Sequence, residues 1–130
     1  MKKAILIVSG SLIALILLGF IAIYSWIDID VKKNISTAKE QYSGKAEDAL
    51  IAYLMDTTNS PQDRSSIAVW TLGQIKSEKA LAELNELYKN DPEGITCKGK
   101  HDAVLCQYEI YKAMNAIKSN WWPLHARLNK

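Results

Sequence analysis

The sequence AILIVSGSLIALILLGFIAIYSWI, from Ala4 to Ile27, contains no charged residue. A helix needs about 20 mostly apolar residues to cross the hydrocarbon core of a bilayer, so this segment is long enough. Tyr24 and Trp26 lie near its end, and aromatic rings that carry a polar atom favour the headgroup region. Residues 1–27 are therefore expected to form a short basic N-terminus followed by a transmembrane helix.

A cleaved secretory signal is the alternative interpretation of this segment. Such signals usually have an apolar region of about 7 to 15 residues that ends at a small-x-small cleavage site. Here the apolar run is longer, and its end offers only Ile23-x-Ser25 as a poor cleavage site. The pattern favours an uncleaved signal anchor.

The orientation in the membrane is not decided by charge, because Lys2 and Lys3 before the apolar segment are matched by Lys32 and Lys33 after it. The two cysteines, Cys97 and Cys106, lie in a polar stretch where a disulfide would be useful. Disulfides persist outside the reducing cytosol. We therefore expect a single-pass protein of the cytoplasmic membrane, with its N-terminus inside and its soluble part outside, which in a bacterial cell is the periplasm.

The part of the chain beyond the anchor is nearly neutral. It holds all 14 acidic residues and 14 basic residues, which are the 16 of the whole chain less Lys2 and Lys3. Nucleic-acid binding needs a concentrated basic surface, and no run of Lys or Arg is longer than two residues. We expect no nucleic acid among its partners.

Apolar residues recur at helical spacing four times in this part, and Pro61, Pro92 and Pro123 fall where that spacing stops. The first predicted helix begins at Ala46 and ends near Asp56. The second begins with Ser60 as a cap and continues to Ile75, since Pro61 and Asp63 suit a first helical turn. The other two are predicted from a cap at Ser77 to Tyr88, and from about Ala103 to Lys118.

The second and fourth predicted helices also share letters. Leu-Gly-Gln-Ile-Lys-Ser at residues 72–77 reappears as Met-Asn-Ala-Ile-Lys-Ser at residues 114–119. The first and third helices match as well, with Ala46 set on Ala80. The second helix pair then has about eight extra residues between its helices, in the stretch that Cys97 and Cys106 bracket. An internal repeat of two helix pairs is therefore predicted.

The chain resembles HEAT-like helical repeat proteins of the short bacterial type. The residues that carry the likeness are Asp63-Arg64, Ala68, Leu72-Gly73-Gln74-Ile75 and Ala80 through Leu87. The second helix pair departs from the pattern, because Cys106 occupies the position that Arg64 has in the first pair, and Asn115 occupies that of Gly73. The resemblance implies an α-solenoid with a binding surface and no common catalytic residue.

The expected fold is thus all-α, with an N-terminal transmembrane helix followed by a small solenoid of about two HEAT-like helix pairs. Residues 28–45 are expected to form a partly helical juxtamembrane stalk, residues 46–119 the repeat domain, and residues 120–130 a tail or cap. Two helix pairs cannot cover their own apolar ends. The stalk and the tail are the predicted covers.

Cys97 and Cys106 are predicted to form a disulfide, although two free thiols packed as small apolar groups fit the sequence too. A metal site is a further alternative, because His101 lies between the cysteines and His125 could be a fourth ligand. The spacing matches none of the usual ligand pairs two to four residues apart. The redox-active Cys-x-x-Cys spacing is also absent from the sequence, so no metal, cofactor or catalytic residue is predicted.

The candidate partner-binding residues are Arg64, Trp70, Tyr111, Trp121 and Trp122, because aromatic and arginine side chains dominate protein interfaces. Arg64 could instead join neighbouring repeats, and the Trp121-Trp122 pair could cap the core or contact lipid. The leading hypothesis is a membrane-anchored adaptor that binds another protein, itself membrane-associated, and no small-molecule substrate. The alternatives are a thiol- or metal-dependent enzyme that uses Cys97, His101 and Cys106, and a protein whose transmembrane helix does the binding.

Overall fold

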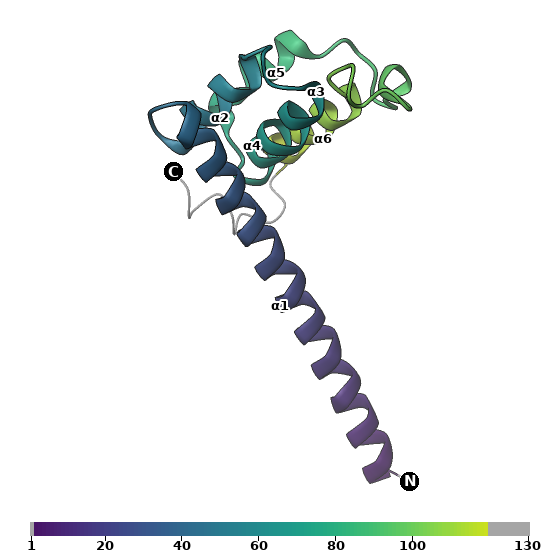
Figure 1. The fold of residues 1–130 in the computed structure, drawn as a ribbon. Coiled ribbons are helices and arrows are strands. Elements are labelled where there is room, and N and C mark those ends of the chain that lie inside the picture. The colour runs from purple at the N-terminus through teal and green to yellow at the C-terminus, as the bar shows by residue number, and fades with distance from the viewer. Residues whose placement is uncertain (1, 120–130) are drawn as a thin grey trace. The chain divides into compact units, whose positions relative to one another are not determined.

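The computed structural model describes residues 2–119, with side chains from Gly10 onward, and this part of the chain is all-helical without a strand. Its contacts divide the chain into two units, Met1–Asp30 and Val31–Lys130. The elements, shown in Figure 1, are α1 (Lys2–Gln41), α2 (Ala46–Met55), α3 (Pro61–Asp63), η1 (Arg64–Val69), α4 (Trp70–Gln74), η2 (Glu78–Ala80), α5 (Leu81–Leu87), η3 (Ile95–Cys97) and α6 (Gln107–Lys118).

The first unit is the apolar part of α1. This helix is long and apolar enough to span a membrane, and none of its most apolar window is buried within the structure. Its leucine, isoleucine and phenylalanine side chains from Leu12 to Ile23 are exposed. At about 1.5 Å per residue, the 40 residues of α1 extend to roughly twice the thickness of a bilayer's hydrocarbon core. The helix does not break after Ile27 and continues through most of the expected stalk.

The last turns of α1 belong to the second unit, as the predicted cover of the first helix pair requires. Val31 and Ala38 are fully buried. Asn34 Nδ2 donates hydrogen bonds to the Ser66 carbonyl at 3.2 Å and to Thr71 Oγ1 at 2.9 Å. These contacts fasten the end of α1 to the helix that runs from η1 into α4.

The core of the second unit lies where α2 packs on η1 and α4, and where α6 packs on α4 and α5. Figure 1 shows these helices beside one another. The largest side chains that are fully buried come from each of these elements: Leu50, Leu54, Val69, Leu72, Leu84 and Ile110. Each belongs to one of the apolar stripes that predicted the four helices.

The second predicted helix forms as three consecutive segments, α3, η1 and α4. Ser60 caps it as predicted, with its hydroxyl oxygen accepting from the Asp63 backbone N–H at 3.1 Å. The middle segment η1 is a π-helix, in which the Trp70 N–H donates to the carbonyl of Ser65, five residues earlier. The apolar periodicity does not distinguish this winding from an α-helix, so the π-helix was not predicted.

The fourth helix begins later than predicted, whereas the third begins directly after Ser77 but as a 3₁₀ turn. Ser77 is fully buried and makes no side-chain cap, and the helix opens with the 3₁₀ turn η2 before α5. The fourth prediction was wrong by one turn, because α6 starts at Gln107 and not at Ala103. The residue before it, Cys106, is extended, with φ −70° and ψ 119°. Gln107, the first residue of α6, contacts the end of α5: its Oε1 accepts from the Lys89 N–H at 2.6 Å and its Nε2 donates to the Leu87 carbonyl at 3.3 Å.

Candidate functional site

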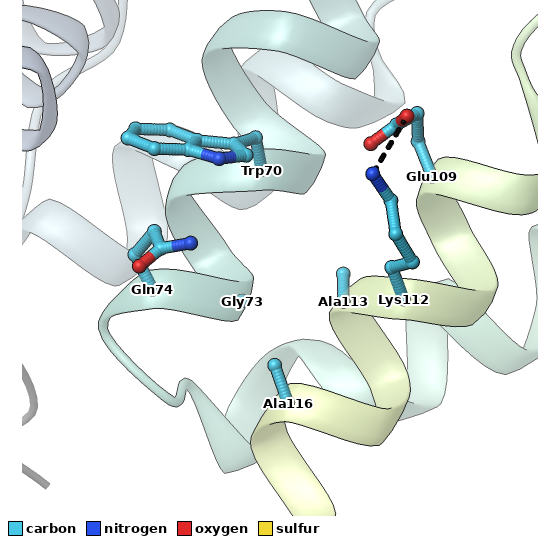
Figure 2. Close-up of a pocket in the computed structure, with 7 residues that line it drawn as sticks. All are labelled: Trp70, Gly73, Gln74, Glu109, Lys112, Ala113 and Ala116. Atoms are coloured by element: carbon cyan, nitrogen blue, oxygen red, sulfur yellow. Dashed lines mark ion pairs between the residues drawn. The ribbon is translucent and has the colours of Figure 1, made fainter. Parts of the chain in front are cut away.

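A groove between α4 and α6 is the first candidate site. Its volume is about 150 Å³. As Figure 2 shows, its lining side chains come from both helices: Trp70, Gly73, Gln74, Glu109, Lys112, Ala113 and Ala116. Small-molecule pockets usually measure roughly 300–1,000 Å³, whereas a cavity of roughly 150 Å³ is enough for a benzene ring. The space therefore suits a single large side chain of a partner better than a cofactor.

The groove exists because α4 and α6 meet at two small residues. A Cβ atom added at Gly73 would lie 3.0 Å from the Ala113 Cα and 3.2 Å from its Cβ. Gly73 and Ala113 are buried, and the half-exposed Ala116 follows one turn later on α6. Small side chains at this crossing leave room beside the contact, and the ring of Trp70 forms one wall.

The rim of the groove carries both signs of charge. Lys112 Nζ lies 3.0 Å from Glu109 Oε1, and the same ammonium group lies 4.6 Å from the centre of the Tyr108 ring. Both charged side chains are partly exposed, so each can exchange its present contact for a partner's group. An apolar floor with a charged rim is the usual composition of a small protein-binding pocket.

Of the predicted partner-binding residues that the structure describes, Trp70 alone lines this groove. Tyr111 is 37% exposed and stacks on Tyr88, with ring centroids 6.1 Å apart, and it does not line the groove. Arg64 is buried, and its Nε donates to the Leu54 carbonyl at 2.6 Å. That contact joins α2 to η1, which belong to the same predicted helix pair, so it is not a link between neighbouring repeats. Trp121 and Trp122 lie outside the described residues.

The lining residues that sequence reasoning missed are Gly73, Gln74, Glu109, Lys112, Ala113 and Ala116. One signal could have found the crossing, namely Gly73 on one helix and the spacing of Ala113 and Ala116 on the other. Small residues at helical spacing mark places where two helices approach closely. The charged rim had no such signal, because charges on an exposed helix face are common.

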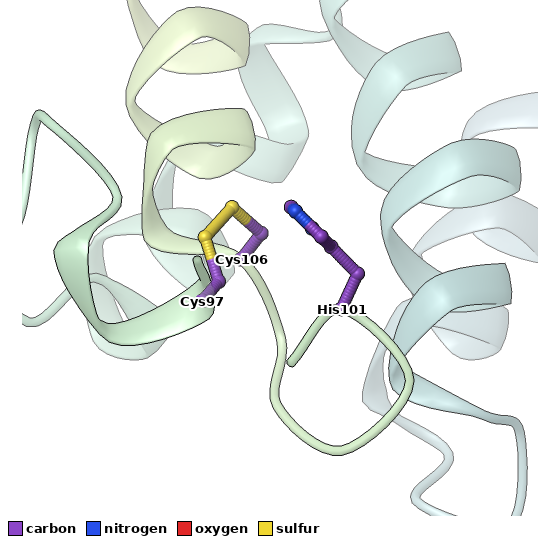
Figure 3. A group of neighbouring side chains, drawn as sticks. All are labelled: Cys97, His101 and Cys106. Carbon is purple, nitrogen blue, oxygen red and sulfur yellow. A yellow bond between two sulfur atoms is a disulfide. The ribbon is translucent and has the colours of Figure 1, made fainter. Parts of the chain in front are cut away.

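The loop between α5 and α6 is the second candidate site. Cys97 and Cys106 lie at disulfide distance, with sulfurs 2.07 Å and Cα atoms 5.1 Å apart, and each is only 2% exposed. His101 is exposed, and in Figure 3 its ring points toward the two sulfurs. One ring nitrogen and both sulfur atoms lie within 4.8 Å of one another. The three residues that the sequence named as possible ligands are thus gathered at one place.

The local backbone before Cys97 is held by Asp91. Its Oδ1 accepts from the Ile95 N–H at 3.0 Å, and its Oδ2 accepts from the Thr96 N–H at 2.9 Å and from the Thr96 hydroxyl at 2.7 Å. These hydrogen bonds, those from Thr96 above all, lower the pKa of Asp91 below its ordinary value. The carboxylate therefore stays ionised and fixes the turn that delivers Cys97.

Gly94 is the other requirement of this turn. Its φ is +65°, in the left-handed region that favours glycine. A Cβ atom there would lie 2.8 Å from the Tyr108 Cβ, 3.1 Å from the Cys97 sulfur and 3.6 Å from the Cys106 sulfur. The backbone of Gly94 thus packs directly on the cysteine pair, which a side chain would prevent.

Two acidic side chains of α5 lie outside both sites. Glu86 is exposed. Glu83 is not fully solvated, because it is half-buried and its Oε2 is buried without a hydrogen-bond partner among the described residues. His125, considered as a fourth metal ligand, lies outside the described residues.

No protein-family model matches the chain, and neither a curated protein nor a solved structure matches it. The HEAT-like resemblance therefore stays a prediction from the residues quoted above.

Proposed function

We propose that the chain is a single-pass membrane protein whose second unit binds another protein at the groove between α4 and α6. The observation that carries this proposal is the groove itself, a ring-sized apolar space with a charged rim. The partner that fits would insert one large apolar side chain beside Trp70 and place charged groups against Glu109 and Lys112. The role is that of an adaptor or accessory subunit and requires no catalysis.

The membrane part of the proposal rests on α1, which is long and apolar enough to span a bilayer. We place the second unit outside the cytoplasm, because the cysteine pair lies at disulfide distance and such bonds persist in oxidising compartments. An impermeant thiol reagent tests this placement. It should label Cys97 and Cys106 in intact cells after mild reduction and should not label them before.

We also propose that α2 with α3–α4 and α5 with α6 are two repeats of a short solenoid. The support is a shared connection. Arg64, near the start of its helix, donates to the Leu54 carbonyl near the end of α2, and Gln107 at the start of α6 donates to the Leu87 carbonyl at the end of α5. In both pairs a polar side chain of the second helix satisfies a carbonyl that the first helix leaves unpaired.

Site-directed photocrosslinking in cells tests the adaptor role. A photoreactive residue in place of Lys112 should give an adduct of one discrete mass, because Lys112 lies on the groove rim. The matched position is Asn115, which is exposed on the same helix and does not line the groove. The adduct should disappear when Ala116→Trp fills the groove and should persist with Asn115→Trp. Equal adducts at both positions, or an adduct that Ala116→Trp leaves unchanged, would contradict binding at the groove.

The same assay separates the two other hypotheses. If the transmembrane helix does the binding, replacing residues 4–27 by an unrelated anchor should abolish the adduct, whereas the adaptor proposal expects it to survive.

A thiol- or metal-dependent enzyme is favoured by the gathering of Cys97, His101 and Cys106. The double variant Cys97→Ser/Cys106→Ser should keep the Lys112 adduct if the groove is the binding site.

A further inference from the structure

The second candidate site has a feature that a structural disulfide does not need. A disulfide requires only Cys97 and Cys106, yet the exposed His101 directs a ring nitrogen to within 4.8 Å of both sulfurs. Histidine nitrogen and cysteine sulfur are the preferred ligands of zinc. We propose that, once the cysteine pair is reduced, Cys97, His101 and Cys106 form a zinc site, so that the disulfide and the metal are alternative states of the same loop.

The geometry needs little change to accept the ion. Tetrahedral zinc with bonds of about 2.3 Å to sulfur and 2.0–2.1 Å to nitrogen places its ligand atoms roughly 3.5–3.8 Å apart. The histidine nitrogen and the sulfurs already lie within 4.8 Å of one another. Once the S–S bond is broken, a rotamer change at one cysteine separates the sulfurs while the Cα atoms stay 5.1 Å apart.

The surroundings also suit a metal. Both cysteines are almost fully buried, which keeps the thiolates from competing solvent, and the exposed His101 leaves an entry path from water. Two thiolates and one imidazole leave a fourth position for water. Asp91 and Gly94 fix the turn before Cys97, so that part of the loop is organised before any ion binds.

The chemical step balances with a dithiol as the reductant. The dithiol transfers two electrons and two protons, the S–S bond between Cys97 and Cys106 breaks to give two thiols, and an S–S bond forms in the reductant. Zinc then displaces the thiol protons and binds the two thiolates. A disulfide oxidant reverses the step: it takes up the two electrons and two protons to become two thiols, the S–S bond between Cys97 and Cys106 forms again, and the zinc ion is released. The inference is independent of the groove and of the proposed adaptor role.

Zinc titration of the full-length, untagged chain in detergent tests this inference, with a phosphine as the reductant because it chelates zinc poorly. The reduced protein should bind one zinc ion per chain and the oxidised protein none, as measured by equilibrium dialysis with metal analysis. Cobalt in place of zinc should give thiolate-to-metal charge-transfer absorption in the reduced protein only. A reduced protein that binds zinc no better than the oxidised one would overturn the inference.

Paired variants identify the histidine as a ligand. His101→Asn should weaken zinc binding at least about tenfold. Even the loss of a residue that only hydrogen-bonds a metal ligand lowers metal affinity by about this factor. Lys100→Asn introduces the same side chain at the adjacent exposed position and should bind like the parent. Both positions are exposed, so the folds should match by circular dichroism. Equal affinities for the His101→Asn variant and the parent would exclude the three-ligand site even if the thiols alone held the ion.

Discussion

Single residues decide whether the loop between α5 and α6 can form, and Gly94 is the most constrained of them. We predict that Gly94→Ala lowers the free energy of unfolding of the second unit. A left-handed residue with a Cβ costs about 1–2 kcal/mol, and the added atom would also lie 2.8 Å from the Tyr108 Cβ. Overpacking of this kind costs about 1–3 kcal/mol more. Thermal or urea unfolding in detergent measures the sum.

Gly99 offers a matched control for this substitution. Its φ is +72°, but a Cβ atom there would meet nothing within 4 Å. Gly99→Ala should therefore cost only the backbone strain, about 1–2 kcal/mol. If the two variants lose equal stability, the close packing of Gly94 on Tyr108 and the cysteine pair contributes nothing.

Asp56, in the turn after α2, accepts a hydrogen bond from Tyr42 at the end of α1. We expect this contact to make the stability of the second unit depend on pH. The Tyr42 hydroxyl donates to Asp56 Oδ2 at 2.6 Å, and the Thr58 N–H donates to Oδ1 at 2.8 Å. The Tyr42 hydrogen bond first, and then those from Thr58, lower the pKa of Asp56 to about 2. The same contact raises the pKa of Tyr42 above 10.0.

The signs of these shifts set the pH window of the pair. A carboxyl with a lowered pKa adds stability that is complete above its unfolded value of about 4 and is lost as pH falls toward 2. A phenol with a raised pKa adds stability that is complete below pH 10 and is lost above its folded pKa. We expect Tyr42→Phe to lower stability at pH 7 and to flatten the loss between pH 4 and 2. The exposed Tyr108→Phe is the control, and identical acid-unfolding curves for Tyr42→Phe and the parent would refute the link.

At the scale of elements, the crossing of α4 and α6 depends on Gly73. Alanine is favoured over glycine inside a helix by about 1 kcal/mol. Here the new Cβ would lie 3.0 Å from the Ala113 backbone, which cannot move as a side-chain end can. Because overpacking costs about 1–3 kcal/mol, we predict that Gly73→Ala is destabilising on balance and widens the groove.

The helical glycine Gly19 supplies the contrast, since a Cβ there meets nothing within 4 Å. Gly19→Ala should leave the unfolding of the second unit unchanged. Equilibrium unfolding and the Lys112 photocrosslink, measured on both variants, report stability and groove shape together. Stabilisation by Gly73→Ala would show that α6 can shift away without loss.

The sequence predicted the elements whose cause is local. The apolar stripe of α2 and the Ser60 cap both form where they were expected, because neighbouring residues are enough to determine them. The late start of α6 could not be predicted from local spacing, since the extended Cys106 before it is paired with Cys97, nine residues earlier in the chain. The π-helix η1 was missed for the same reason, because the Ser66 carbonyl accepts from Asn34 of α1.

Of the residues that the sequence named, the structure brings Cys97, His101 and Cys106 to one place and puts Trp70 in the lining of the groove. It did not reveal which neighbours share a site with them, because Trp70 meets Ala116 only through the packing of α4 on α6. Arg64 looks from its type alone like a binding residue. Only its hydrogen bond to Leu54 identifies it as part of the core.

At the scale of the whole molecule, the proposed anchor should keep the chain in the membrane fraction. Arginine at the centre of a membrane helix costs about 2.5–3.5 kcal/mol, so Leu15→Arg/Leu18→Arg should release much of the chain from membranes at alkaline carbonate. Leu15→Ala/Leu18→Ala keeps the segment apolar and should stay bound. Sedimentation with immunoblotting measures both, and a parent chain that washes free without detergent would contradict the anchor.

The π-winding of η1 holds one residue more than an α-helix would need there. A hydrogen bond from Trp70 to Ser65 encloses one residue more than an α-turn does. Deleting one residue between Arg64 and Val69 would let the same N–H and carbonyl pair as an α-turn, so the helix after it would keep its orientation. Gly73 would still face Ala113, and η1 therefore absorbs the extra residue without disturbing the crossing of α4 and α6.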